Sequence, residues 1–216
     1  MTGRGKVRYA MSRRFRRGLI AAALLAGVLL ILLDHYGGVG FRNNLPVLMG
    51  LRGEDAGKYH LKSFRVVKVV DGDTVDINIA DGEYATTRVR LLGVDTPETK
   101  MPGESPMYYG EQASAFAVEL VLGQEVTIVI DTVSDVRDRY GRLLGYVRFG
   151  GGRVLNEELI VNGFGYADLR FDHSDYDRYV RLQEEAIEKG VGLWEDVRRD
   201  QVPKWLLRER PGLLSQ

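Results

Sequence analysis

The sequence contains no cysteine and only three histidines among its 216 residues. Without cysteine the protein cannot form a disulfide scaffold, a thiolate zinc site or an iron–sulfur cluster, and it cannot use a cysteine nucleophile. Any metal ion must therefore be held by oxygen ligands or by His35, His60 or His173. Because these histidines show no ligand spacing, we expect them to be ordinary surface or packing residues.

The chain also lacks a net charge, since 30 basic residues balance 30 acidic ones. Seven of the basic residues fall within residues 1–17, which contain no acid, so 23 basic residues face 30 acidic ones in the remainder. A net-acidic body is a poor generic nucleic-acid binder, because phosphate contacts depend on Lys and Arg. If the protein acts on nucleic acid, we expect a local site that is helped by a cation.

A long apolar run at residues 19–33 contains only Leu, Ile, Val and Ala apart from Gly27. As a helix it measures about 22 Å, which is shorter than a bilayer core of about 30 Å. With the basic cluster before it, the run predicts a transmembrane anchor or a signal peptide at 18–36, behind a basic cytoplasmic tail at 1–17. The anchor is favoured, because only the weak small-x-small pattern of Gly38 and Gly40 offers a cleavage site. In either case we expect the rest of the chain outside the cytoplasm, on a single-pass membrane protein or secreted.

A length of 216 residues favours one domain with flanking segments. The 44% of apolar residues can supply a core and the 28% of charged residues is normal for a soluble fold, which together exclude global disorder. We expect a Gly-rich linker at 37–57, a folded domain at 58–195 and a C-terminal tail at 196–216. Apolar periodicity and the turn signals Asp71-Gly72-Asp73 and Asp81-Gly82 divide the domain. The predicted elements are strands at 64–70, 75–79 and 84–94, a helix ending at Gly123, strands at 125–130 and 143–149, and helices at 155–162 and 179–187. This order predicts an α+β fold, mainly β, in which helices pack against a small antiparallel barrel.

Acidic residues gather where the predicted strands end. Asp71 and Asp73 occupy the first turn, and Asp95 and Glu98 follow the third strand. Two carboxylates and a backbone carbonyl, such as that of Thr96 before Pro97, make a hard oxygen site for Ca²⁺ or Mg²⁺. Taken singly, each of these motifs is also compatible with an ordinary turn.

Arginine supplies the complementary chemistry. Arg90 lies on the polar face of the third strand, and Arg142 enters the fifth. A guanidinium matches the oxygens of a phosphate and keeps its charge at any biological pH, although a lone surface arginine more often forms a salt bridge. A carboxylate base, a divalent cation and two arginines are the parts needed to hydrolyse a phosphodiester.

Six segments, taken together and in order, resemble the staphylococcal nuclease (thermonuclease) family. The resemblance covers about residues 60–195 and rests on VDGDTV at 70–75, RLLGVDTPET at 90–99, YGEQA at 109–113, DRYGR at 138–142, VLNEEL at 154–159 and GLW at 192–194. It implies a five-stranded OB-fold barrel with three packed helices, here preceded by one hydrophobic N-terminal helix. It also implies a Ca²⁺-dependent endonuclease, with Mg²⁺ the less favoured metal, that acts on DNA and RNA. The rival hypothesis is a non-catalytic OB-fold module that binds nucleic acid or protein.

The resemblance assigns a role to each matching position. Its metal ligands are Asp73, Asp95 and the carbonyl of Thr96, with Asp71 in support; its general base is Glu98; and the scissile phosphate is held by Arg90 and Arg142. Tyr140 and Phe171 are the expected substrate contacts. Here the chain departs from the family prototype, because Leu169 and Phe171 stand where tyrosines are expected, with Tyr166 nearby. No protein partner is evident, and we expect a monomer.

Overall fold

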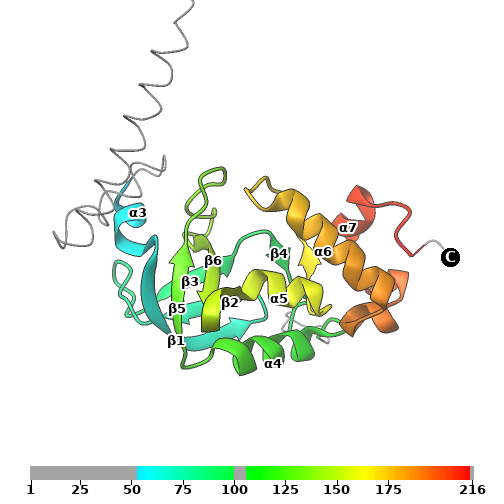
Figure 1. Cartoon of the computed structure of the whole chain (residues 1–216), viewed down its shortest axis with the longest axis horizontal. Helices are drawn as coiled ribbons and strands as arrows, with labels where there is room; N and C mark the ends of the chain where they lie inside the picture. Colours follow the sequence, from blue (N-terminus) through cyan, green and yellow to red (C-terminus); the bar gives the residue numbers. More distant parts are fainter. Residues whose placement is uncertain (1–52, 100–105, 215–216) are drawn as a thin grey trace, which may run out of the picture. The chain divides into compact units, whose positions relative to one another are not determined.

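The computed structural model describes residues 53–99 and 106–214, in which five strands close into a barrel (Figure 1). The strands are β1 (Lys62–Asp71), β2 (Thr74–Ile77), β3 (Thr87–Leu91), β5 (Glu125–Val129) and β6 (Leu143–Phe149). Antiparallel pairs run in the order β3-β2-β1-β5-β6, and a parallel pair between β3 and β6 closes the ring. The structure thus confirms the expected α+β fold, an OB-fold barrel with packed helices.

Side chains alternate between the two faces of β3, as the pleat of a strand requires. Val89 and Leu91 are buried in the core. Arg88 lies on the other face, where it donates hydrogen bonds of 2.8 and 3.0 Å to the buried carboxylate of Asp76 on β2. Arg90 shares that face of β3 and pairs with Thr74 in the ladder, next to the β1–β2 turn.

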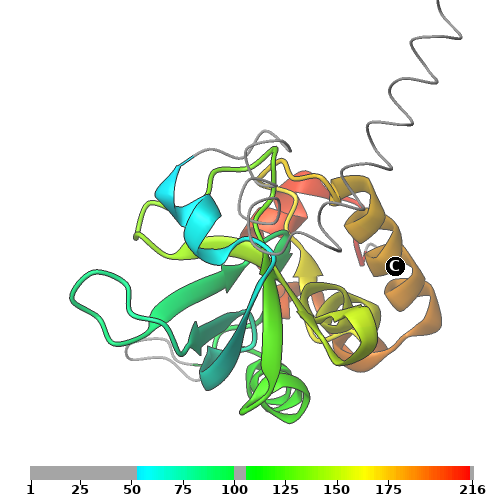
Figure 2. The same cartoon turned by 60° about the vertical axis from the view of Figure 1, so that its left-hand side comes forward.

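Three helices cover the barrel: α4 (Gly110–Val121), α5 (Leu155–Val161) and α6 (Tyr176–Lys189). α4 buries Ala113, Ala117 and Val121, whose spacing of four places them on one face. α6 ends at Lys189, and Gly190 caps it with a left-handed φ of 61°. Figure 2 shows α4 at one end of the strands, with α5 and α6 beside them.

The strand predicted at 84–94 is broken in the structure. β3 ends at Leu91, and a second short strand, β4 (Val94–Asp95), pairs with β8 (Tyr166–Ala167). The break occurs because Gly93 adopts a φ of 73°, which turns the chain. Gly93 also packs against the ring of His173, which an added Cβ would meet at 2.4 Å. The turn carries the chain back over Arg90.

The remaining elements were not predicted. They are the helices α3 (Glu54–Tyr59) and α7 (Lys204–Glu209), the strand β7 (Arg153–Val154) and the 3₁₀ turns η1 (Gly150–Gly152), η2 (Gly192–Glu195) and η3 (Arg199–Gln201). A second hydrophobic cluster joins α6, η2 and α7 through residues that include Ala186, Trp194, Trp205 and Leu206. Residues 196–214 therefore fold against α6, as Figure 1 shows at the right of the view.

The N-terminal predictions fall on residues that the structure does not describe. The tail at 1–17, the helix at 18–36, most of the linker at 37–57 and His35 all lie outside the described residues. Within residues 53–99 and 106–214, no helix has the length and apolar character needed to cross a membrane. His60 and His173 are both buried, in agreement with packing roles.

Candidate active site

The guanidinium of Arg90 joins two carboxylates that are 22 residues apart in the chain. Nη1 lies 2.9 Å from Oδ2 of Asp73, and Nη2 lies 2.7 Å from Oδ1 of Asp95. Nη1 also donates to the carbonyl of Val94 at 2.7 Å, so the turn after β3 grips the same side chain. The β1–β2 turn and β4 therefore place Asp73 and Asp95 against one guanidinium, whose side chain is only partly exposed.

The carboxylate of Asp73 accepts two hydrogen bonds from Thr96. Its Oδ2 accepts the amide N–H of Thr96 at 2.8 Å and the Thr96 hydroxyl at 3.2 Å. The β1–β2 turn and the segment after β4 can approach this closely only because residue 72 is glycine: a Cβ there would meet the Thr96 hydroxyl at 2.8 Å. Burial raises the pKa of Asp73 to about 6, since the charge of Arg90 compensates only in part and the carboxylate of Asp71 opposes ionisation further.

Asp95 has a partner on each of its oxygens besides Arg90. Its Oδ2 accepts the indole N–H of Trp205 at 2.9 Å, and its Oδ1 lies 3.1 Å from Nη2 of Arg170. Burial raises the pKa of Asp95, and the carboxylates of Asp73 and Asp168 act in the same direction, against Arg90 and Arg170. Sequence reasoning missed Trp205, Arg170 and Asp168, because none of them falls in a recognised motif of charged residues.

Glu98 lies at the exposed side of this cluster. Partial desolvation raises its pKa, and so do the carboxylates of Asp73 and Asp95, whereas Arg90 and Arg142 lower it. Its backbone carbonyl accepts the N–H of Met107 at 3.0 Å, which fixes the loop against the start of α4. Its carboxylate makes no hydrogen bond to any residue in the described part of the chain. Glu98 is therefore a carboxylate with an available oxygen and electrostatic coupling to both arginines.

The Arg142 guanidinium is held through its Nε, whereas its two Nη groups point to no acceptor in the described residues. Its Nε donates to Oδ2 of Asp138 at 2.6 Å, and its backbone N–H donates to Oδ1 at 3.0 Å. These bonds outweigh the partial burial of Asp138 and lower the pKa of that carboxyl. The two Nη groups of Arg142 make no hydrogen bond to any residue within 53–99 or 106–214. Arg142 directly precedes β6, the strand that pairs with β3, and its charge, like that of Arg90, lowers the pKa of Glu98, so its guanidinium lies within electrostatic range of the cluster.

A second arginine secures the loop that carries Arg142. Arg137 pairs with Asp55 of α3 at 2.7 Å and with Asp81 at 2.7 Å, and its Nη1 also donates to the carbonyl of Gly141 at 2.7 Å. Three separate segments thus meet at one guanidinium. Arg137 holds the turn one residue before Arg142.

Two exposed aromatic rings lie near arginines of the cluster. Tyr140 is 68% exposed, with the guanidinium of Arg142 at 5.4 Å from its ring centroid. Phe171 is 61% exposed, with the guanidinium of Arg170 at 5.7 Å. Phe171 is therefore a surface residue, whereas Leu169 packs into the hydrophobic clusters.

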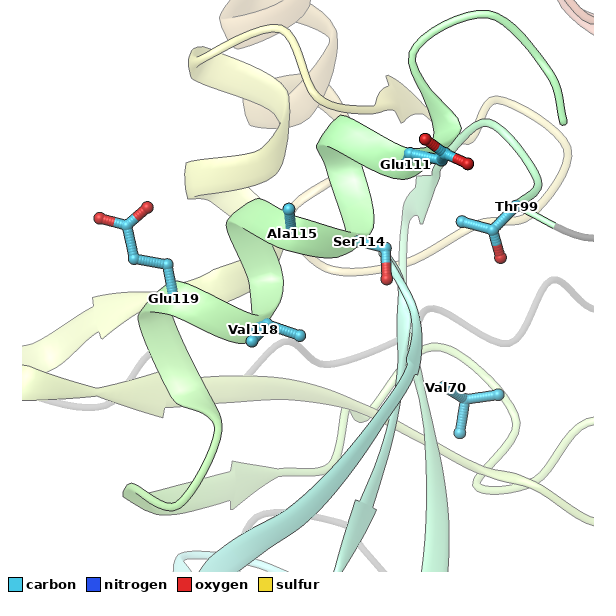
Figure 3. A pocket seen from close by; sticks show the side chains of 7 residues that line it. All are labelled: Val70, Thr99, Glu111, Ser114, Ala115, Val118 and Glu119. Atoms are coloured by element: carbon cyan, nitrogen blue, oxygen red, sulfur yellow. The ribbon is translucent and has the colours of Figure 1, made fainter.

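A shallow hollow lies outside this cluster, along α4 and the end of β1 (Figure 3). Glu111 and Glu119 of α4 contribute its charged side chains, and Val70 and Thr99 line it from other segments. Of the described residues that line it, none is basic. A polyanion would be repelled there, so the arginine cluster is the better candidate for phosphate binding.

The cluster also has the chemistry to bind a hard cation. Asp71, Asp73, Asp95 and Asp168 outnumber Arg90 and Arg170, and the pKa values of Asp73 and Asp95 are both raised despite their arginine partner. Over residues 53–99 and 106–214, no three acidic or histidine side chains converge as a complete metal centre. A cation here would take the two carboxylates of Asp73 and Asp95 and fill its remaining positions with neutral oxygens, which Ca²⁺ and Mg²⁺ both accept.

Known proteins that are similar to this chain include several described as nucleases. Residues 88–196 match the family model described as "Staphylococcal nuclease homologue". The chain is 36% identical over 135 residues to a thermonuclease of Staphylococcus intermedius, which covers 62% of this chain and 77% of that protein. It is 32% identical over 136 residues to a thermonuclease of Staphylococcus hyicus (62% and 77%), and 35% identical over 147 residues to an uncharacterized endonuclease of Escherichia coli O157:H7 (68% and 84%).

Proposed function

Since the chain belongs to the staphylococcal nuclease family, we propose that it is a Ca²⁺-dependent nuclease that cleaves DNA and RNA endonucleolytically. The observation that carries the proposal is the convergence of Asp73 and Asp95 on Arg90, with Glu98 and Arg142 electrostatically coupled at the edge. A module that only binds nucleic acid does not need Asp73 and Asp95 paired on one arginine, next to a carboxylate and a guanidinium whose oxygens and Nη groups make no hydrogen bond to the described residues.

In this mechanism Glu98 acts as the general base. Its carboxylate removes a proton from a water molecule while the water oxygen attacks phosphorus. The bond between phosphorus and the 5′ oxygen then breaks, which leaves a 3′-phosphate on one strand end and a 5′-hydroxyl, protonated by solvent, on the other. A raised pKa makes Glu98 a stronger base than an ordinary glutamate.

The two arginines stabilise the charge that develops on the phosphate. Arg142 presents both Nη groups and provides a two-point contact with phosphate oxygens. Arg90 is held by Asp73, Asp95 and backbone carbonyls, so it is preorganised and contributes its charge without reorientation. Tyr140 and Phe171 flank the arginines and offer rings on which bases can stack.

The metal ligands in this proposal are the carboxylates of Asp73 and Asp95 and the carbonyl of Thr96, with Asp71 in support. A Ca²⁺ ion held by them would supply additional positive charge next to the phosphate. The hard oxygen donors and the excess of carboxylates over guanidiniums support a divalent cation.

The direct test uses the full-length protein with circular DNA and with RNA, in Ca²⁺ and in EGTA. Cleavage of a circle requires endonucleolytic activity, and we expect it in Ca²⁺ only. Glu98→Gln and Arg142→Ala should each lower kcat by about 10²-fold or more, with much smaller effects on substrate binding. Glu119→Gln and Arg148→Ala make the same chemical changes away from the cluster and should leave kcat within twofold. Binding without cleavage by the unaltered protein would show that the rival module hypothesis is right.

We also propose that residues 18–36 anchor the protein in the membrane with the nuclease domain outside the cytoplasm. The basic residues before the apolar run favour a cytoplasmic N-terminus, and the Gly-rich segment after it gives the domain reach. Outside the cytoplasm Ca²⁺ is plentiful, and the cell's own nucleic acid is out of reach.

A further inference from the structure

We propose that Trp205 is a positioning residue of the active site, through which α7 orients the Asp95 carboxylate for cation binding. The inference rests on the proposed function, because it takes Asp95 as a metal ligand. It extends the site beyond residues 88–196, the segment that matches the family model.

The two oxygens of Asp95 are fixed from different directions. Oδ1 is held by Nη2 of Arg90 at 2.7 Å, and Oδ2 accepts the indole N–H of Trp205 at 2.9 Å. Trp205 is only 8% exposed, so the bond to this charged group is shielded from water and stronger than a surface hydrogen bond. Without the indole donor, Oδ2 has no partner in the described residues and the carboxyl group can rotate about the Arg90 contact.

The face of the Trp205 ring has a second role. The guanidinium of Arg170 lies 4.4 Å from the ring centroid, which is the geometry of a cation–π contact. Arg170 also donates to Asp168 at 2.7 and 2.8 Å and lies 3.1 Å from Oδ1 of Asp95. The edge of the indole thus contacts Asp95, and its face packs on the guanidinium of Arg170, which lies next to Asp95.

The position of α7 does not depend on this hydrogen bond. Leu206 is fully buried in the second hydrophobic cluster, beside Ala186 and Leu193. Arg199 ties the end of the chain down by donating to the carbonyl of Leu213 at 2.6 Å. Packing therefore sets the helix, and the helix presents a preorganised donor to Asp95, as an effective outer-shell group must.

Trp194 provides a matched control. It belongs to the same cluster, but its indole N–H is buried without a hydrogen-bond partner in the described part of the molecule. Trp194→Phe and Trp205→Phe remove the same atoms from the same cluster, and only the second removes a bond to Asp95. Loss of an outer-shell partner typically weakens metal binding 10- to 100-fold.

The experiment is calorimetric titration of Ca²⁺ into the full-length protein and the two variants, purified in detergent. We expect about tenfold weaker binding or more for Trp205→Phe, and binding within twofold of the unaltered protein for Trp194→Phe. In cleavage assays Trp205→Phe should need more Ca²⁺ for half-maximal activity, with an unchanged KM for nucleic acid. Equal Ca²⁺ affinity in the two variants would overturn the proposal.

Fluorescence tests the same contact without altering it. The chain has two tryptophans, so Trp194→Phe leaves Trp205 as its sole indole emitter. Its emission should change as Ca²⁺ binds, whereas the emission of Trp205→Phe should not; a Trp194→Phe protein that is silent to Ca²⁺ refutes the positioning role. Failure of the nuclease proposal looks different, since the unaltered protein would then bind Ca²⁺ with dependence on Trp205 and cleave nothing.

Discussion

Asp73→Asn should stabilise the fold while it abolishes nuclease activity. The pKa of Asp73 rises from 3.8 to about 6 in the folded protein, mainly through burial. The folded state therefore keeps its proton to a higher pH than the unfolded state, and stability is lost as pH rises from about 4 to about 6. A difference of about two pKa units at about 1.4 kcal/mol each gives a loss of about 3 kcal/mol, complete above pH 6.

Asparagine removes this cost and keeps the local geometry. Its amide oxygen can still accept the N–H of Thr96, and Arg90 keeps its pair with Asp95. Urea unfolding in EGTA should show Asp73→Asn to be more stable than the unaltered protein by up to about 3 kcal/mol at pH 7.5, with little difference at pH 4. Added Ca²⁺ should stabilise the unaltered protein and have little effect on the variant.

Asp76→Asn is the matched control. Asp76 and Asp73 are both 6% exposed and both pair with an arginine, but Asp76 forms a two-point pair with Arg88 on the outer face. Asp76→Asn should destabilise the protein by about 1 kcal/mol, because Arg88 loses its charged hydrogen-bond partner. If Asp73→Asn is no more stable than the unaltered protein at pH 7.5, or if its advantage is the same at pH 4, then ionised Asp73 does not destabilise the fold.

Four further outcomes are expected. In saturating Ca²⁺, kcat/KM should rise with pH through the raised pKa of Glu98, on the alkaline side of 4.5, since the base acts ionised; a flat profile from pH 4.5 to 7.5 contradicts the role. Arg137→Ala should lower stability by about 1–2 kcal/mol and kcat about tenfold, because it frees the loop of Arg142, and unchanged values in melts and kinetics would exclude that link. Phe171→Ala should raise KM about tenfold with an unchanged melting temperature, as expected for an exposed stacking ring. Cell fractionation should find the full-length protein in membranes and its domain open to added protease in spheroplasts; a shorter soluble product would mean signal cleavage.

Local sequence signals predicted most of the barrel. The alternation of Val89 and Leu91 with Arg88 and Arg90, and the turn signal at Asp71–Asp73, are encoded within a few residues and survive in the structure. What could not be predicted is the difference between the two arginines. The Arg88 side chain is 47% exposed, whereas that of Arg90 is only 13% exposed, because the turn at Gly93 folds the chain over it.

The contact between Trp205 and Asp95 could not be predicted from the sequence either. Trp205 follows the last recognised motif and lies 110 residues from Asp95, so no periodicity or spacing connects them. The two-residue strands β4 and β8 are too short for any alternation to register. Such contacts are produced by tertiary packing, here by the second hydrophobic cluster, and leave no local pattern in the sequence.

The parallel ladder that closes the barrel has a consequence for folding order. It pairs Arg90 with Leu144, so closure must wait until β6 has been synthesised, and contacts of such large sequence separation form late and slowly. The two arginines of the cluster lie on opposite sides of this seam, and Trp205 emerges later still. Arg90 and Arg142 therefore stay apart in a nascent chain until this ladder forms, and Asp95 gains its Trp205 partner only after α7 has docked.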